Sequence, residues 1–347
     1  MGLLDDKVIL VTGGTGSFSH QFVEVVLRNH RPKKLILYSR DELKQHEMSQ
    51  QFPDERLRFF IGDVRDKERL SRAMTGVDFV IHAAALKQVP ACEYNPFEAV
   101  KTNIIGAVNI IDTAIDRGVK RVVALSSDKA VGPISLYGAT KLCAEKLFMQ
   151  GNAYAGLEGA RFCSVRYGNV VASRGSVIPL FREQRATGSI TVTDRRMTRF
   201  WITLDQGVAL VLRALETMHG GEIFVPKIPS MSIMDLVEAI APGCAVAFTG
   251  IRPGEKLHEV LISTDEAHHT LEFDDMFVIQ PPYPWWKMER WAGGKPLKDG
   301  FMYSSQNNAQ QLTVERLREM VAHLDLRREP TMVSVGADGR EERCDKV

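Results

Sequence analysis

The chain has 347 residues, of which 44% are hydrophobic and 25% charged, and 44 Lys and Arg balance 43 Asp and Glu. These proportions are ordinary for a globular enzyme, and a net charge of +1 excludes a protein that binds nucleic acid through a basic surface. Five scattered cysteines without a CxxC pair predict a reducing compartment, with neither disulfides nor a zinc site. The acidic amino terminus and the lack of an apolar run of about 18 residues predict a cytoplasmic protein without a signal peptide or membrane span.

Strand-like and helix-like segments alternate through the first half of the chain. Apolar runs predict strands at residues 7–12, 34–38, 57–61, 79–82, 122–125 and 162–167. A helical stretch follows the first strand to about residue 28, and longer amphipathic segments cover residues 98–117 and 137–153. Strands separated by helices of this length predict an α/β protein with a Rossmann-like, doubly wound parallel sheet.

After about residue 169, prolines break the alternation into shorter pieces. The pattern predicts a Rossmann domain over residues 1–168 and a smaller α/β region, mostly for substrate binding, over residues 169–326. Residues 327–347 are polar and charged with little periodicity, so we expect a disordered tail there.

A glycine-rich turn, TGGTGSFS at residues 12–19, follows the first predicted strand and opens a helix. Its glycines allow a tight turn, which lets main-chain N–H groups approach a pyrophosphate at the helix N-terminus. At the start of a βαβ pattern this predicts a dinucleotide site, although Ser19 replaces the third glycine of the usual spacing. The predicted cofactor contacts in the turn are Gly13, Thr15, Gly16, Ser17 and Phe18.

The end of the second predicted strand carries the signal for the type of dinucleotide. An acid there would bind the ribose 2′-hydroxyl of NAD, whereas a 2′-phosphate needs positive charge and hydroxyl groups. Ser39 and Arg40, with Lys44 one turn later, favour NADP, while Asp41 keeps NAD open. The further predicted cofactor contacts are Glu42, Leu43, Asp63, Val64, Ala83, Tyr137, Lys141 and Val170.

Tyr137 and Lys141 form a YxxxK pair, and this spacing places both side chains on one helix face. A phenol, with an unperturbed pKa of about 10, needs nearby positive charge to act as a base, and Lys141 supplies it. Ser127, Asp128 and Lys129 follow the fifth predicted strand, at the edge where α/β sheets bind ligands. The pattern predicts Asp128, Lys129 and Tyr137 as catalytic residues, with Ser127 bonding a substrate hydroxyl.

These motifs resemble the extended short-chain dehydrogenase/reductase family. More narrowly, residues 7–324 are similar to the C5-inverting UDP-N-acetylglucosamine 4,6-dehydratases, which begin pseudaminic acid biosynthesis. The most specific runs are SRDELKQ (39–45), FIGDVRD (60–66), HAAALKQVP (82–90), SSDKAV (126–131), LYGATKLCAEKLF (136–148), MTRFWITLDQGV (197–208) and GIRPGEKLHEV (250–260). The chain departs from the pattern at Ser19, at Ser127 where threonine is usual, and in the tryptophan-rich stretch 285–291, which we interpret as a packing feature.

The resemblance implies an NADP-dependent hydro-lyase. Tyr137 would take the proton of the sugar 4-hydroxyl, Lys129 would remove the C5 proton, and Asp128 would protonate the departing 6-hydroxyl. Hydride return to C6 and reprotonation of C5 from the opposite face would give UDP-2-acetamido-2,6-dideoxy-β-L-arabino-hex-4-ulose. The residues implied in substrate binding are Lys87, Ser126, Ser127, Asn169, Arg174, Ile178, Arg199, Arg252 and Glu255. The resemblance also implies a homo-oligomer, with a hexamer built from dimers as one form.

Three alternatives stay open. A UDP-hexose 4-epimerase would use the same fold and Tyr137 but would not need the Asp128–Lys129 pair. A retaining 4,6-dehydratase often carries methionine in place of Tyr137. A non-catalytic NADP-binding protein predicts a degraded YxxxK motif, which this chain does not have. No metal-ligand spacing appears, so His82, His219 and His258 are interpreted as structural and no metal is predicted.

Overall fold

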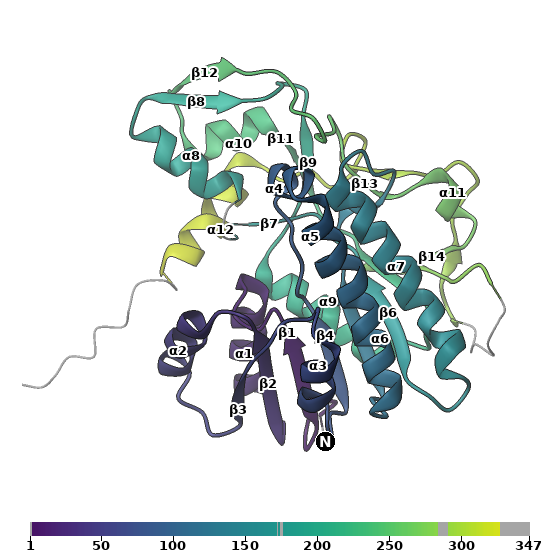
Figure 1. Cartoon of the computed structure of the whole chain (residues 1–347). Helices are drawn as coiled ribbons and strands as arrows, with labels where there is room; N and C mark the ends of the chain where they lie inside the picture. The colour runs from purple at the N-terminus through teal and green to yellow at the C-terminus, as the bar shows by residue number, and fades with distance from the viewer. Residues whose placement is uncertain (1, 172, 174–175, 284–290, 327–347) are drawn as a thin grey trace, which may run out of the picture.

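A ten-stranded sheet forms the centre of the molecule (Figure 1). The computed structural model describes residues 2–171, 173, 176–283 and 291–326. The parallel strands are β1 (Val8–Thr12), β2 (Lys34–Ser39), β3 (Leu57–Ile61), β4 (Phe79–His82), β5 (Arg121–Leu125), β6 (Arg161–Val165) and β10 (Ile223–Pro226). The strands β14 (Thr270–Glu272), β15 (Met276–Ile279) and β16 (Lys295–Pro296) add an antiparallel edge.

The strand order is β16-β14-β15-β10-β6-β5-β4-β1-β2-β3. The part from β3 to β6 has the Rossmann order, with its reversal between β1 and β4, so the predicted doubly wound parallel sheet is confirmed. The sixth strand is shorter than predicted and ends at Val165. Beyond the ends of β5 and β6, main-chain hydrogen bonds continue from the Ser126 N–H to Val165 O at 2.7 Å and from the Asp128 N–H to Tyr167 O at 3.1 Å, and Tyr167 forms part of a cavity wall.

Helices cover both faces of the sheet (Figure 1). On β1, Ile9 and Val11 pack in one core with α1 (Ser17–Asn29) and α9 (Leu204–Thr217), whereas Leu10 packs in a second core. That second core contains residues of α3 (Lys67–Ala73), α6 (Gly106–Asp116) and α7 (Leu136–Ala155). Successive strand residues point to opposite faces, so each buried strand supplies both cores, which explains its continuous apolar run.

The helix predicted over residues 98–117 is interrupted. It consists of α5 (Pro96–Val100), a π-helical turn (Lys101–Ile105) and α6. Within the turn, Asn103 bonds both the N–H and the C=O of Leu86, at 2.8 and 2.9 Å, and its amide donates to Thr140 Oγ1 at 3.0 Å. The turn therefore ties the segment after β4 to α7, which carries the YxxxK motif.

Residues beyond 169 contribute to two parts of the molecule. β10, β14, β15, β16 and α9 join the central sheet and its helical cover. The remaining elements form small sheets and a third core above the carboxyl ends of the parallel strands (Figure 1). They are β7 (Asn169–Val170), α8 (Val177–Arg185), β8 (Ser189–Val192), β9 (Thr198–Ile202), β11 (Ser230–Ser232), α10 (Ile233–Ile240), β12 (Ala245–Phe248), β13 (Val260–Ile262), β17 (Tyr303–Ser304) and α12 (Val314–Leu326). The domain boundary at residues 168 and 169 stays a prediction.

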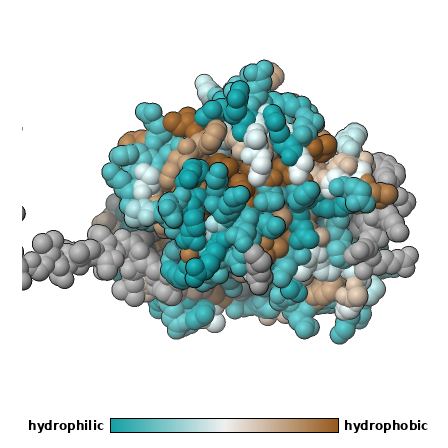
Figure 2. Space-filling view, turned by 90° about the horizontal axis from the view of Figure 1, so that it is seen from below, coloured by the Kyte–Doolittle hydropathy of each residue, from teal (hydrophilic) through white to brown (hydrophobic). Residues whose placement is uncertain are grey.

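The remaining short helices are α2 (Glu42–Gln51), α4 (Val89–Tyr94), the 3₁₀ turn η2 (Asp128–Ala130) and α11 (Thr264–Ala267). The face seen from below in Figure 2 is mainly hydrophilic, with smaller groups of hydrophobic residues. Within the described ranges, no helix is both long and apolar enough to span a membrane. The expected disordered tail at 327–347 and residues 285 and 286 of the tryptophan-rich stretch lie outside the described residues. Trp291 is described, and its ring packs against Phe224 and Phe273, as a packing feature would.

Candidate active site

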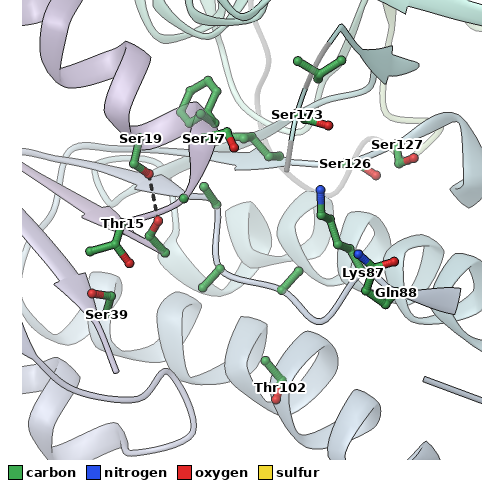
Figure 3. Close-up of a pocket in the computed structure, with 18 of the residues that line it drawn as sticks. Thr15, Ser17, Ser19, Ser39, Lys87, Gln88, Thr102, Ser126, Ser127 and Ser173 are labelled. Atoms are coloured by element: carbon green, nitrogen blue, oxygen red, sulfur yellow. Dashed lines mark hydrogen bonds between the residues drawn. The ribbon is translucent and has the colours of Figure 1, made fainter. Parts of the chain in front are cut away.

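A cavity of about 700 Å³ opens where the parallel strands end (Figure 3). The segments that follow β1 to β6 all contribute to its wall, as expected for ligand binding at the switch point of a doubly wound sheet. The predicted residues that line it are Gly13, Thr15, Gly16, Ser17, Phe18, Ser39, Arg40, Asp41, Lys44, Asp63, Val64, Ala83, Lys87, Ser126, Ser127, Lys129, Tyr137, Lys141, Asn169 and Val170. The cavity thus joins the predicted cofactor residues to most of the predicted reaction residues.

The turn after β1 approaches its neighbours too closely for side chains. Gly13 has φ +67°, and a Cβ there would lie 3.0 Å from the main chain at Ala83 and Ala84. Ser19, which replaces the expected third glycine, is fully buried, and its hydroxyl donates to Gly13 O at 2.9 Å. The serine therefore fastens the turn to the first turn of α1, which carries no acidic residue. This N-terminus suits an anionic group.

At the end of β2, the acid is engaged in its own helix. Asp41 caps α2 by accepting from the Lys44 N–H at 3.0 Å and pairs with Lys44 Nζ at 2.7 Å. The hydrogen bond from the Lys44 side chain holds the pKa of Asp41 below its usual value. Arg40 Nη1 lies 3.7 Å from Asp63 Oδ2, and about half of the Arg40 side chain is exposed. Ser39 and Arg40 both line the cavity. Glu42 and Leu43, in the first turn of α2, are not among the described residues that line the cavity.

The residues present fit a dinucleotide cofactor. Among the described residues, the buried hydroxyl oxygens of Thr102 and Ser126 have no hydrogen-bond partner, and both residues line the cavity. A Cβ at Gly14 would lie 2.9 Å from Leu37 of β2, so the turn packs directly on the neighbouring strand. Donors for a pyrophosphate and unpaired hydroxyls for its sugars are therefore arranged along one cavity.

Tyr137 lies in the first turn of α7, which Ser135 caps by accepting from the Gly138 N–H. A Cβ at Gly138 would lie 2.3 Å from Lys129 O, so only glycine lets this turn pack against η2. Burial raises the pKa of Tyr137 to about 12, and the neighbouring charge that opposes this shift most strongly is Lys129. The close packing of α7 on η2 therefore places the phenol near the charge of Lys129.

Lys141 is buried and donates from Nζ to Leu125 O at 2.5 Å. Burial lowers the pKa of Lys141 to about 8, against the attraction of Glu145. His82 is also buried, and its Nδ1 lies 2.8 Å from Thr12 Oγ1. Burial, with the charge of Lys141, lowers the pKa of His82 to about 3, so this imidazole is neutral and structural.

Asp128 is fully buried behind the cavity wall. Its Oδ1 accepts from Ser127 Oγ at 2.8 Å and from Lys129 Nζ at 3.0 Å, while its Oδ2 has no hydrogen-bond partner among the described residues. The Ser127 hydroxyl also shares a hydrogen bond with Tyr137. Asp128 is therefore connected to the cavity through Ser127 and Lys129, both of which line it.

The pKa of Lys129 depends on burial and on two carboxylates near its amine. Burial favours the neutral amine, but the attraction of Asp128 and Glu259 outweighs it, so the pKa of Lys129 is raised. The side chain is 30% exposed, and its charged end faces the cavity between these carboxylates. Lys129 is thus an ammonium at neutral pH in this arrangement.

Comparison with known proteins agrees with this geometry. Residues 9–281 match the model of the family described as "polysaccharide biosynthesis protein". The chain belongs to this family of extended short-chain dehydrogenase/reductases. A family relative from Campylobacter jejuni subsp. jejuni (strain 81-176), named UDP-N-acetylglucosamine 4,6-dehydratase (inverting), is 53% identical over 93% of this chain and 99% of its own length. Another from Rickettsia conorii, named UDP-glucose 4-epimerase, is 40% identical over 92% of this chain and 96% of its own length.

Solved structures give the same picture of the fold. The protein Pen from Bacillus thuringiensis has a TM-score of 0.86 and 40% identity, covering 93% of this chain and 99% of its own. A dTDP-glucose 4,6-dehydratase from Streptomyces venezuelae, solved with NAD bound, has a TM-score of 0.64 and 24% identity, covering 72% of this chain and 86% of its own. The second likeness shows the Rossmann fold of the family alone.

Asn169 and Val170 of β7 line the cavity, but four other predicted residues of the upper part are not among the described residues of its wall. Ile178 is fully buried in the third core, and Arg199, Arg252 and Glu255 are absent from the described lining residues. Arg199 donates to the carbonyls of Lys256 and Leu257, both at 3.0 Å, which ties β9 to the segment before β13. Arg174 lies outside the described residues.

Within that segment, Arg252 and Glu255 pair at 3.2 Å. Glu255 Oε2 is buried without a hydrogen-bond partner among the described residues. One acceptor therefore remains for a ligand donor or water, as the predicted role of Glu255 requires.

Two residues of the site escaped the sequence analysis. Gly138 was treated only as a spacer, although its lack of a Cβ allows α7 to contact η2. Glu259 is the last residue but one of the GIRPGEKLHEV run, and its carboxylate lies 3.5 Å from Lys129 Nζ. An acid directly before an apolar strand was the available signal for Glu259, but the sequence could not tell which strand end it would face.

Proposed function

We propose that this protein is a C5-inverting UDP-N-acetylglucosamine 4,6-dehydratase that uses NADP and forms UDP-2-acetamido-2,6-dideoxy-β-L-arabino-hex-4-ulose, as in the first step of pseudaminic acid biosynthesis. The observation that carries the proposal is the Asp128–Lys129 pair, 3.0 Å apart, beside Tyr137 at the cavity. A 4-epimerase does not need this pair for its chemistry. The 53% identity to a relative of that name supports the same assignment.

A bound nicotinamide dinucleotide would supply the oxidation at sugar C4 and the later reduction at C6. Tyr137 takes the proton of the 4-hydroxyl, and the Ser127 hydroxyl orients the two oxygens. The C4 ketone makes the C5 proton acidic, and Lys129 in its neutral form removes it. Asp128 Oδ1 accepts from Lys129 Nζ at 3.0 Å, so the proton that Lys129 takes from C5 passes on to Asp128, and Asp128 supplies it to the 6-hydroxyl, which leaves as water. Because Asp128 is fully buried, we infer that this proton passes through Ser127 or Lys129, each within 3.0 Å of Asp128 Oδ1.

The preference for NADP over NAD rests on the end of β2. Ser39 and the half-exposed Arg40 are suited to a 2′-phosphate, while Asp41 is engaged with Lys44 and the α2 N-terminus. For the sugar nucleotide, Lys87 reaches into the pocket on the side of Ser126 and Ser127 (Figure 3). The cytoplasmic location and the homo-oligomeric state stay predictions.

Purified protein is expected to release NADP or NADPH when it is denatured, without any added cofactor. The reason is that each turnover returns the cofactor to its starting state, so the site gains nothing from exchange. Identification of the released nucleotide by chromatography checks this. Arg40→Ala should retain less nucleotide, whereas Arg28→Ala, which removes an exposed arginine paired with Glu24, should retain as much as the unmodified protein. Release of NAD would contradict the assignment.

A UDP-hexose 4-epimerase is the second candidate, because a relative named UDP-glucose 4-epimerase shares 40% identity with this chain. Incubation with UDP-N-acetylglucosamine separates the two. A dehydratase product has lost one water and carries a 4-ketone, whereas an epimerase product keeps its 6-hydroxyl and is inverted at C4. Product NMR with mass spectrometry therefore tests the proposed function.

A further inference from the structure

Glu259 is a buried carboxylate beside the amine of Lys129. The residue is 2% exposed and directly precedes β13, which contacts the 3₁₀ turn η2. Its Oε1 lies 3.5 Å from Lys129 Nζ, and its Oε2 lies 3.8 Å from Lys256 Nζ. The main chain of Glu259 is fixed on both sides, since its N–H donates to Ser305 Oγ and its C=O accepts from the Ser305 N–H, both at 2.9 Å.

This arrangement is costly unless it serves Lys129. A buried carboxylate loses its hydration and needs hydrogen bonds or a close ion pair in return. Glu259 Oε2 has no hydrogen-bond partner among the described residues, and the ion pair to Lys256 is long. The closer positive charge is Lys129 Nζ, 3.5 Å from Glu259 Oε1, and this amine also pairs with Asp128 of its own turn at 3.0 Å. The amine therefore lies between a carboxylate of η2 and one of a separate segment.

We propose that Glu259 is a positioning residue for the reaction: it holds Lys129 Nζ at the cavity wall and controls when that amine is uncharged. This inference rests on the proposed function, in which Lys129 removes the C5 proton. Lys256, which also donates to Val131 O at 2.5 Å, acts in the opposite direction by moderating the charge of Glu259.

The direction of each effect follows from the charges around Lys129. They are Asp128 on η2, Lys256 and Glu259 before β13, Arg199 on β9, Lys87 after β4 and the Tyr137 phenol on α7. Burial lowers the pKa of Lys129, but Asp128 and Glu259 outweigh it and the net shift is upward. Loss of the Glu259 charge must therefore lower the pKa of Lys129, so that the neutral amine forms at lower pH. Loss of the Lys256 charge must raise the pKa of Lys129, so that the neutral amine forms only at higher pH.

The test is the pH profile of kcat for dehydration of UDP-N-acetylglucosamine. Because the neutral amine of Lys129 is the base, kcat should rise with pH on the alkaline side of the profile, which we call the alkaline limb. Glu259→Gln keeps the shape of the side chain and removes its charge, and the alkaline limb of this variant should move to lower pH by about one unit or more. Lys256→Gln should move the limb to higher pH. Glu259→Asp should return the limb towards that of the unmodified protein. The matched control is Glu272→Gln, which removes a carboxylate of β14 that pairs with Lys227, and it should leave the alkaline limb in place.

A second measurement separates positioning from a structural role. In Glu259→Gln, exchange of solvent deuterium into C5 should fall about 10- to 100-fold, because the amine is displaced from its aligned position. The rate at which bound nicotinamide is first reduced, which depends on Tyr137, should stay unchanged. The inference would be overturned if Glu259→Gln slowed deuterium exchange and nicotinamide reduction equally, or if its alkaline limb did not move. The same shift of the limb in Glu272→Gln would also overturn it. If the unmodified protein forms no dehydrated product, the proposed function itself fails, which is a different outcome.

Discussion

Tyr137→Phe is expected to lower kcat about 100- to 10,000-fold, because the sugar 4-hydroxyl loses the group that takes its proton. The Tyr137 side chain is buried in a cluster with Cys92 and Ala99, and its hydroxyl shares a hydrogen bond with Ser127, so phenylalanine fits the space but breaks the proton path. Oxidation at C4 is the first chemical step, and the variant should therefore stop before any nicotinamide is reduced. Rapid mixing with UDP-N-acetylglucosamine, followed by absorbance of the reduced nicotinamide, measures this.

The control is Tyr94→Phe on α4, where the side chain is 87% exposed and the hydroxyl faces solvent. Its kcat and its absorbance trace should match those of the unmodified protein. Normal reduction of the nicotinamide in Tyr137→Phe would show that another group takes the 4-hydroxyl proton.

Lys129→Ala is expected to abolish water loss while leaving C4 oxidation in place. The amine is the base for C5, and its loss also removes the donor that connects Asp128 to the cavity. The variant should therefore accumulate reduced nicotinamide after mixing with substrate and release no dehydrated product. The trace should differ from that of Tyr137→Phe, which stops one step earlier.

Removing Lys129 also removes a positive charge that lowers the pKa of Tyr137, so the onset of oxidation in Lys129→Ala should move to higher pH. Lys129→Arg keeps the charge and serves as the matched variant, with normal onset but no base at neutral pH. Identical absorbance traces for Tyr137→Phe and Lys129→Ala would contradict the division of roles between the two residues.

The fold was predictable because its signals are local. Each buried strand reads as an apolar run, and the glycine turn at residues 12–19 marks the first βα unit. The strand order then follows from the right-handed βαβ rule and the switch point that a doubly wound sheet requires. The π-helical turn at Lys101–Ile105 was not predictable, because it depends on Asn103 reaching Leu86 and Thr140 across the fold.

The candidate site was predictable only where its residues follow a strand end. Gly13, Ser39 and Ser127 fall in the cavity because parallel strands end at the same edge. The upper residues depend on tertiary packing that no local signal gives. The sequence makes the Arg199 guanidinium a candidate for binding a substrate phosphate, yet in the structure it donates to main-chain carbonyls. Glu259 reaches Lys129 from 130 positions away along the chain, so its role could appear only in three dimensions.

Electrostatics also needed the structure. Burial and the charge of Asp128 act in opposite directions on the pKa of Lys129, and the amino-acid sequence alone does not show which is larger. In the structure the attraction of Asp128, together with that of Glu259, outweighs burial, and the pKa of Lys129 is raised. Tyr137 was expected to depend on Lys141, whereas the strongest opposing charge is that of Lys129, and Lys141 donates to Leu125 O.

The stereochemistry and isotope content at C5 test the central claim most directly. The reaction with UDP-N-acetylglucosamine is run in D₂O, and the product is examined by NMR. Removal of the C5 proton by Lys129 and its replacement from solvent on the opposite face predict deuterium at C5, no solvent deuterium at C6, and inverted configuration at C5. A dehydrated product with retained C5 configuration would contradict the inverting assignment, and an intact 6-hydroxyl with inversion at C4 would contradict the dehydratase.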